Sequence, residues 1–217
     1  MPRPSVTLKL ATSLDGKIAL ANGQSEWITG EAAREAGRRL RGSHDGIAVG
    51  ANTAVLDNPQ LTTRIDGLPN PVRIVFDSQL RLSVDSNLVQ TAQETPTWVF
   101  TKSLEVSYAN TLKNNGVVVL PVAYDKGLDV PAALDILHRR SITTLLVEGG
   151  GQLAASFLKT GCVDRIEWFR APLILGGDGR DCIGALGLEN LMSARQYERV
   201  EWRELGPDMY ERYEKLS

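Results

Sequence analysis

The sequence predicts an α/β domain with a mostly parallel, mixed β-sheet, and three observations lead to this prediction. Apolar, β-branched runs alternate with helix-forming stretches from the amino end to about residue 160, which is typical of right-handed βαβ units. Strand-like segments then follow one another without a helix, which indicates antiparallel strands added at the carboxyl end. No stretch has the composition and length of an interdomain linker, so we expect one domain over residues 1–217.

Length and composition fit one globular domain and argue against several classes of protein. The chain has 217 residues, 42% of them hydrophobic, and a net charge of −2, so it can bury a sizeable core. A near-neutral chain lacks the basic surface of a nucleic-acid-binding protein, and no uncharged apolar run approaches the roughly 18 residues of a membrane span. Cys162 and Cys182 form no CxxC pair, and the charges of Arg3, Lys9 and Asp15 interrupt any signal-like apolar segment. We therefore expect a cytoplasmic protein with reduced thiols.

The predicted strands of the first part are short and mostly apolar. Residues 6–11 alternate apolar and polar side chains and are followed by a turn at residues 13–16. Further along the chain, short apolar runs are typical of buried central strands. These runs are residues 46–50, 73–77, 97–100, 117–120 and 143–147.

Helices are predicted between these strands, and the carboxyl-terminal part returns to strands. Good helix formers follow a possible N-cap at Thr29 and predict a helix over residues 30–41, whereas Pro131 fits the first turn of a helix over about 131–140. A third helix is predicted from about residue 152 to 159, after three glycines. The carboxyl-terminal strands are predicted at residues 166–169, 197–205 and 210–213.

The strongest local indication of a ligand site is Glu148 with the three glycines that follow it, between a predicted strand and a predicted helix. Glycines let the backbone approach a phosphate, and a helix amino end offers free N–H groups and a partial positive charge. A tight turn without a ligand is the alternative. Glu148 favours a site, because a carboxylate at the end of a buried strand is costly unless it is paired or used. Ligands of open α/β sheets also bind at the carboxyl ends of the strands.

A second candidate segment covers residues 50–64 and also begins where a predicted strand ends. Small residues followed by Asp57 and Arg64 suggest a ligand loop. A surface turn with a solvated arginine remains an open alternative.

The other charged residues give weaker indications. Arg34, Arg38 and Arg41 share one helix face, which is usually a solvated face, and Arg41 lies at the helix end best placed to reach a cleft. His44 and His138 are isolated from each other and from cysteines, so we expect no metal site.

Several ordered motifs make the chain resemble the reductase module of riboflavin biosynthesis. They stand in this sequence as KLATSLDGK at 9–17, SEWIT at 25–29, TAVLDNP at 53–59, LTTR at 61–64, VFDS at 75–78 and VEGGG at 147–151. The resemblance covers about residues 3–213 and implies a dihydrofolate-reductase-like fold with three layers, αβα. It also implies that NADPH reduces the ribosylamino side chain of 5-amino-6-(5-phosphoribosylamino)uracil to the ribityl form. The HxE and PCxxC motifs of the zinc deaminase to which this module is often fused are absent. We therefore expect a free-standing reductase or the reductase half of a bifunctional enzyme.

The resemblance also assigns roles to individual residues. For the substrate it implies Arg41 and Arg64 at the ribose phosphate, with Ser25, Leu61 and Glu148 in contact as well. For the cofactor it implies a larger set, which comprises Ala11, Trp27, Thr53, Asp57, Ser78, Gly150, Gly151, Gln152, Leu153, Ala154, Ala155 and Ser156.

Lys9, Asp57 and Glu148 are the candidates for handling the catalytic proton, because all three are expected on or just after strands that end at one edge. The sequence does not divide the roles among them. Two alternatives stay open: a reductase of this fold for a pterin or another carbonyl or imine substrate, and a non-catalytic nucleotide-binding module. Arg41 and Arg64 favour a phosphorylated substrate, and the two acids favour an enzyme.

Two further expectations concern the cofactor and the assembly. Ser78, together with Thr101 and Lys102 after the next strand, can hold the 2′-phosphate that distinguishes NADPH from NADH. A homodimer is implied by the resemblance. Ile166, Trp168 and Phe169 of a carboxyl-terminal strand, beside the apolar residues 171–175, favour it, since a terminal edge strand rarely exposes so much apolar surface.

Overall fold

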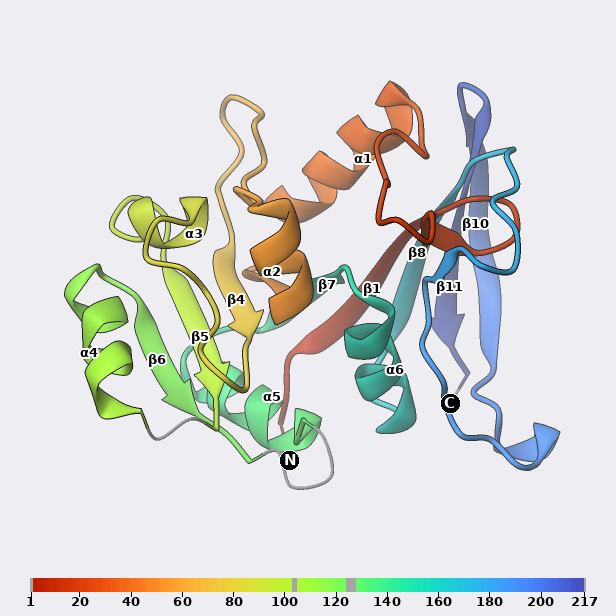
Figure 1. Ribbon diagram of the computed structural model, residues 1–217. Coiled ribbons are helices and arrows are strands. Elements are labelled where there is room, and N and C mark those ends of the chain that lie inside the picture. The colour runs from red at the N-terminus through yellow and green to blue at the C-terminus, as the bar shows by residue number, and fades with distance from the viewer. Residues whose placement is uncertain (1, 103–104, 124–127, 217) are drawn as a thin grey trace. The chain divides into compact units, whose positions relative to one another are not determined.

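The computed structural model describes residues 2–102, 105–123 and 128–216 (Figure 1). The chain forms two compact units. Unit 1 comprises residues 38–146 with the amino-terminal residues up to Ser5, and unit 2 comprises residues 6–37 and those from Val147 onward. The chain passes between the units inside a regular element each time, within β1 (Ser5–Thr12), α1 (Glu31–Gly42) and β7 (Thr144–Glu148).

Unit 1 is built from alternating strands and helices. Besides β7, its elements are β3 (Gly46–Gly50), α2 (Ala51–Asp57), β4 (Val72–Phe76), α3 (Asn87–Gln90), β5 (Thr97–Thr101), α4 (Val106–Asn114), β6 (Val118–Pro121) and α5 (Val130–Arg139). Its strands lie in the order β7-β3-β4-β5-β6, and β3 to β6 pair in parallel. The carboxyl ends of these parallel strands therefore meet at one edge.

One face of these strands packs against three helices. Ile47 of β3 and Val99 of β5 belong to a buried cluster that also contains Ala54 of α2, Leu88 of α3 and Leu112 of α4. Successive side chains of a strand point to opposite faces. The residues next to Ile47 and Val99 therefore face away from α2, α3 and α4.

The opposite face of the same strands carries aromatic rings and α5. Phe76 and Phe100 stack with ring centres 5.2 Å apart. Arg140, which follows α5, lies over the Trp98 ring at 5.5 Å. Unit 1 thus has the expected three layers, with α2, α3 and α4 on one face and α5 on the other (Figure 1).

Unit 2 combines a parallel pair of strands with an antiparallel extension. Besides β1 and the first part of α1, its elements are β2 (Lys17–Ala19), α6 (Gly151–Lys159), β8 (Arg165–Arg170), β9 (Arg180–Asp181), a 3₁₀ turn (Leu191–Ser193), β10 (Tyr197–Leu205) and β11 (Asp208–Lys215). β1 pairs in parallel with β8, β8 pairs antiparallel with β11, and β11 pairs antiparallel with β10. β2 and β9 form a small separate sheet.

The predicted α/β class, the mostly parallel mixed pairing and the antiparallel carboxyl-terminal strands are confirmed. The predicted strands and helices lie within one or two residues of the observed bounds. Within the described residues, no helix combines the length and apolar character needed to cross a membrane.

The segment of residues 50–64 differs from the prediction of a ligand loop, because its first half is the helix α2. Ala51 and Ala54 are buried, so this short helix is held by packing rather than by a long apolar period that the sequence would display. Asn58 ends the helix in a left-handed conformation (φ 39°). The loop proper begins only after α2.

β8 is an internal strand of unit 2, not the expected edge strand. It pairs with β1 on one side and with β11 on the other, and Ile166 and Phe169 are buried. Burial inside the unit explains the apolar side chains of Ile166 and Phe169. Ile166 and Phe169 therefore give no support for a homodimer, whereas Ile174, in the apolar segment that follows β8, is 71% exposed.

Candidate active site

Glu148 ends β7, and the turn that follows it is built from glycines. Gly149 and Gly150 have φ values of 94° and 80°, which side-chain-bearing residues rarely adopt. The turn leads directly into α6 at Gly151. Glu148 is 8% exposed, so its carboxylate is held at the carboxyl end of a buried strand, where α/β proteins place their ligands.

Lys9 on β1 faces Glu148 within unit 2. Lys9 Nζ lies 3.8 Å from Glu148 Oε2 and 5.7 Å from the centre of the Phe169 ring. The end of the lysine chain also packs beside Gly37 of α1, where a Cβ would lie 3.4 Å from Lys9 Cε. Ala11, two residues further along β1, is partly buried on the same face as Lys9. The two predicted catalytic residues of unit 2 are thus adjacent, and an ion pair shielded from water interacts more strongly than an exposed one.

The amino end of α6 has the features of a phosphate site. Its N-cap, Gly150, has no side chain that caps the helix, and the first bond inside the helix runs from Ala154 N–H to the Gly150 carbonyl (3.1 Å). The N–H groups of the residues between these two have no acceptor inside the helix, and the helix dipole adds partial positive charge. These features fit the pyrophosphate of a dinucleotide.

The predicted pyrophosphate loop divides into two parts. Gln152 is exposed, and the Gly151 carbonyl accepts a hydrogen bond from Gly184 N–H at 2.8 Å. The side chains of residues 153–155 are buried, and the Ser156 hydroxyl donates to the Gln152 carbonyl at 3.0 Å. The first turn of α6 therefore offers the backbone donors, whereas the later residues pack or bond within the unit.

Ser25 and Trp27 lie in an exposed segment before α1. Trp27 is 69% exposed, and the Arg34 guanidinium lies over its ring at 4.3 Å. The end of this segment is anchored, because Asp208 Oδ2 accepts a hydrogen bond from Gly30 N–H at 2.6 Å. An exposed ring held by an arginine can pack against a flat ligand.

Thr53 and Asp57 belong to α2 in unit 1. Thr53 is partly buried, and Asp57 is exposed at the last position of the helix. We expected Asp57 just after a strand, at a buried edge. That expectation is wrong, because α2 lies between β3 and Asp57 and carries this carboxylate out toward water.

The loop after α2 carries Leu61 and Arg64 on an unusual backbone. Asn58, Leu61 and Arg64 have φ values of 39°, 56° and 51°, a left-handed conformation that costs about 1–2 kcal/mol for a residue with a side chain. Leu61 is buried in the core of unit 1, whereas Arg64 is exposed. Arg41 reaches the same loop, because its Nη1 donates to the Thr62 carbonyl at 3.0 Å. Unit 1 thus brings Arg41 to the loop that bears Arg64.

Ser78, which follows β4, and Thr101, the last residue of β5, are in contact. Thr101 Oγ1 donates to the Ser78 carbonyl at 3.3 Å, so this hydroxyl is directed at the backbone. Ser78 is partly buried, and Lys102 is exposed. The pair marks the carboxyl ends of β4 and β5.

In the part of the chain that the structure describes, no three His, Cys, Asp or Glu side chains gather as a metal site would require. Burial raises the pKa of Cys182 to about 11, so its thiol is a poor nucleophile at neutral pH. Arg34 and Arg38 are partly buried, and the Arg34 guanidinium lies over the Trp27 ring.

The sequence analysis missed three residues that organise the loop of Arg64. Asn70, Arg73 and Asn87 each make a hydrogen bond to residues 58–63. Arg73 could have been found in the sequence, because a charged residue at the start of a predicted buried strand is costly unless it binds other groups. No such argument points to the two asparagines.

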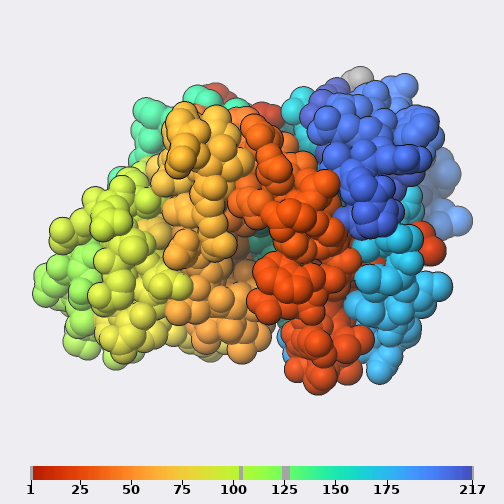
Figure 2. All heavy atoms as spheres, turned by 90° about the horizontal axis from the view of Figure 1, so that it is seen from above, coloured from red at the N-terminus to blue at the C-terminus, as the bar shows by residue number. Residues whose placement is uncertain are grey.

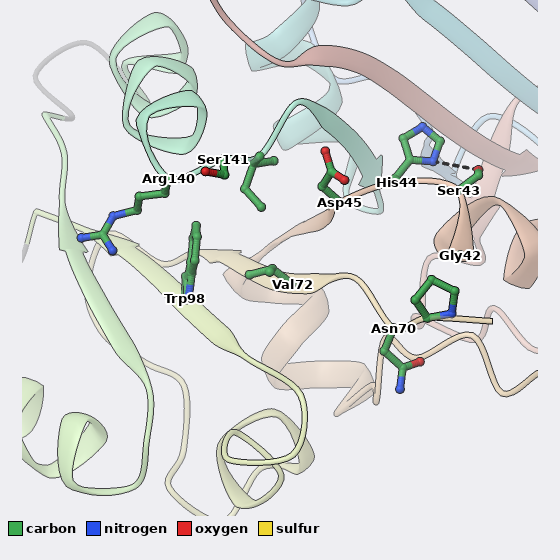
Figure 3. A pocket seen from close by; sticks show the side chains of 11 residues that line it. Gly42, Ser43, His44, Asp45, Asn70, Val72, Trp98, Arg140 and Ser141 are labelled. Atoms are coloured by element: carbon green, nitrogen blue, oxygen red, sulfur yellow. Dashed lines mark hydrogen bonds between the residues drawn. The ribbon is translucent and has the colours of Figure 1, made fainter. Parts of the chain in front are cut away.

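A separate open pocket of about 500 Å³ lies in unit 1 (Figure 3). Its walls include His44, Asn70, Trp98 and Arg140, and it opens at the amino ends of β3, β4 and β5. Figure 3 shows Arg140 beside Trp98 at one end and His44 with Asn70 toward the other. This is the sheet edge opposite to the one where α/β proteins bind their ligands. None of the predicted site residues lines it.

Comparison with known proteins gives consistent matches along the chain. A family model, the RibD C-terminal domain, matches residues 4–210. The riboflavin biosynthesis protein RibD of Bacillus amyloliquefaciens is 37% identical over 209 residues, which are 95% of this chain and 56% of that protein. The 2,5-diamino-6-ribosylamino-4(3H)-pyrimidinone 5′-phosphate reductase of Methanothermobacter thermautotrophicus is 37% identical over 216 residues, which are 97% of this chain and 98% of that protein.

A solved structure extends these matches to the fold. The diaminohydroxyphosphoribosylaminopyrimidine deaminase/5-amino-6-(5-phosphoribosylamino)uracil reductase of Thermotoga maritima is similar with a TM-score of 0.83 and 30% identity. The match covers 99% of this chain and 57% of that one. The chain therefore spans little more than half the length of the bacterial relatives and nearly all of the archaeal one.

Proposed function

Because this chain belongs to the RibD C-terminal domain family, we propose that it is an NADPH-dependent reductase of riboflavin biosynthesis. The proposed reaction reduces 5-amino-6-(5-phosphoribosylamino)uracil to the 5-phosphoribitylamino product. Support comes from the archaeal relative, which is named a reductase and matches along nearly its whole length.

The observation that carries the proposal is the pair Lys9 and Glu148 beside the glycine turn of α6, with 3.8 Å between Nζ and Oε2. When bound, NADPH supplies a hydride, and the protein must orient the accepting carbon and manage one proton. We assign the amine-bearing part of the substrate to Glu148, whose carboxylate lies beside the Lys9 ammonium. Together they provide a positioned acid and base for the proton.

The cofactor part of the proposal rests on two regions. The N–H groups at the start of α6, after Gly150, fit the pyrophosphate. Ser78 and Lys102, at the ends of β4 and β5, are suited to hold a 2′-phosphate through a hydroxyl and a cation. We therefore expect a lower dissociation constant for NADPH than for NADH. Fluorescence titration tests this, and equal constants would remove the 2′-phosphate site from the proposal.

The substrate phosphate is assigned to Arg41 and Arg64. A dianion in a chain of net charge −2 needs locally fixed cations. Arg64 is exposed, and none of the hydrogen bonds or ion pairs within the described residues uses its guanidinium. Arg41 approaches the same loop through Thr62.

The proposal also covers organisation and location. We treat residues 1–217 as one reductase domain, supported by the single family match over residues 4–210 and by the chain crossings inside β1, α1 and β7. We also propose that the protein forms a homodimer and acts in the cytoplasm. The free thiols of Cys162 and Cys182 are in keeping with that compartment.

One experiment separates this function from its competitors. NADPH oxidation is followed at 340 nm with three substrates: 5-amino-6-(5-phosphoribosylamino)uracil, its 2,5-diamino-4(3H)-pyrimidinone counterpart, and an unphosphorylated dihydropterin. We expect turnover of the uracil compound. Turnover of the diamino compound alone would move the chain to the substrate named for its archaeal relative. Turnover of the pterin alone, or NADPH binding without oxidation, would overturn the proposed function.

A further inference from the structure

The loop of residues 58–64 bears Arg64 and is held in a strained backbone. Asn58, Leu61 and Arg64 all adopt left-handed φ values within seven residues. Such residues persist only where their surroundings over-determine the conformation. The contacts that hold this loop therefore fix the backbone from which the Arg64 side chain extends.

Asn87, the first residue of α3, holds the beginning of the loop. Its backbone N–H donates to Asn58 Oδ1 at 2.8 Å, and its Nδ2 donates to the Asn58 carbonyl at 2.7 Å. Two bonds between the same residues fix orientation as well as position. In Figure 2 the yellow stretch that contains α3 lies against the light-orange stretch that contains the loop.

Arg73 on β4 holds the middle of the loop from inside unit 1. It is 1% exposed, and its Nη1 donates to the Gln60 carbonyl at 3.3 Å and to Thr91 Oγ1 at 2.8 Å. Its Nη2 donates to the carbonyls of Leu88, Thr91 and Thr95. Desolvation lowers the pKa of Arg73 to about 10, so it stays charged at neutral pH.

A buried cation is a costly way to fill a core position. An apolar side chain of similar size packs such a site at no desolvation cost. What the guanidinium adds is its fork of donors, which reaches the loop and the end of α3 at the same time. Arg73 and Asn87 thus act on residues 60 and 58, just before Leu61 turns into the core.

We propose that Arg73 and Asn87 are positioning residues that clamp residues 58–60 and thereby aim Arg64 at the substrate phosphate. The substrate part rests on the proposed function. The clamp itself can be measured in the free protein.

The main test is Asn87→Ala, which removes the side-chain bond to Asn58 at the surface of unit 1. We expect KM for the pyrimidine phosphate to rise about 10-fold, because misplacing a substrate contact by about 1 Å costs up to about 10²-fold. Turnover at saturation and the Kd of NADPH should change less than about 2-fold. Amide hydrogen exchange at residues 61–63 should accelerate by a similar factor, about 10-fold, while exchange in β3 stays unchanged.

Arg73→Lys tests the second half of the clamp. Lysine keeps the charge but has one ammonium in place of the planar fork, so it cannot serve Gln60 and the end of α3 together. The same rise in KM and in loop exchange is expected, with a loss of stability as well. If this variant does not fold, Asn87→Ala still decides the proposal.

Asn115→Ala is the matched control, since it removes an exposed asparagine bond of similar length, to the Thr111 carbonyl at the end of α4 (2.9 Å). It should leave KM and the exchange of residues 61–63 unchanged. Wild-type KM and wild-type exchange in Asn87→Ala would overturn the clamp. Absence of turnover in the unmodified enzyme would instead overturn the proposed function, and the exchange data would still decide the clamp.

Discussion

Glu148 is nearly buried, and its carboxylate lies 3.8 Å from the Lys9 ammonium, where it can exchange a proton with a bound substrate. In Glu148→Gln, size and hydrogen-bonding reach are kept, but the group can no longer take up a proton. We expect kcat to fall at least about 10²-fold, since general acid–base catalysis contributes roughly 10²–10⁴-fold. The Kd of NADPH should change little, because its pyrophosphate is assigned to the start of α6. Steady-state rates and a cofactor titration check both statements, and a wild-type kcat would leave Lys9 and Asp57 as the candidates.

A substitution of Arg64 tests the assignment of the substrate phosphate to this residue. A hydrogen bond to a charged group contributes roughly 1.5–3 kcal/mol, so Arg64→Ala should lower kcat/KM about 10- to 150-fold, mainly through KM. Arg139→Ala is the control, because its exposed ion pair with Asp135 on α5 is of the kind that contributes little. An unchanged KM in Arg64→Ala would show that the guanidinium only faces solvent.

Individual residues differ in how far the sequence could predict them. Glu148 was predictable, since an apolar strand before it and glycines after it leave few places for its carboxylate. Asp57 was not, because the helix α2 is short and is stabilised by burying two alanines rather than by a visible apolar period. Arg73 and Asn87 contact residues distant in the sequence, so no local pattern predicts which residues they bind.

At the scale of elements, Asp45 ties the start of β3 to the start of β7. Its Oδ2 accepts hydrogen bonds from Thr143 N–H, Thr143 Oγ1 and Thr144 N–H at 2.8, 2.6 and 3.0 Å. Burial opposes ionisation, but these hydrogen bonds outweigh it and hold the pKa of Asp45 below its ordinary value of 3.8. A lowered pKa in the folded state means that the stabilisation is complete above about pH 4 and is lost as the pH falls through the folded-state pKa.

Asp45→Asn should therefore lower the free energy of unfolding by about 1 kcal/mol at pH 7, a value reduced for the exposure of the site. The difference from the wild type should shrink as the pH falls below about 4. Urea unfolding at pH 7, 5 and 3 measures it, with the exposed Asp85→Asn as a control. A difference that does not depend on pH would mean that packing, not the charge, accounts for the loss.

Elements were predictable where the local signal was strong. The parallel strands are nearly continuous apolar runs, and α5 has Pro131 in its first turn and Asp129 as an N-cap that accepts from Ala132 N–H. α4 is weakly amphipathic and buries Leu112 alone, so its sequence resembles a polar connection. β2 and β9 are too short for alternation to show and exist because they pair with each other.

At the scale of the whole molecule, the outer edge of β10 is the feature that bears on assembly. This strand lies at the end of the strand order, so its outer edge is unpaired within the described chain. Val200 and Trp202 on it are 49% and 60% exposed. The charged residues that alternate with them, Glu201 and Arg203, are typical of an edge protected against uncontrolled pairing. A specific partner with the same edge satisfies both observations, because a two-fold interface presents the same patch from each copy.

We therefore expect a homodimer, with sedimentation equilibrium giving about twice the 23.7 kDa of the chain at micromolar concentration. Trp202→Glu adds a charge to the exposed face of β10 and should shift the equilibrium toward monomer. Trp27→Glu is the control, since it adds the same charge at an exposed tryptophan in the segment before α1. A 23.7 kDa species in the wild type would contradict the dimer. A dimer that both variants leave intact would place the interface away from β10. The exposed Leu191 and Met192 of the 3₁₀ turn would then be the next apolar residues to substitute.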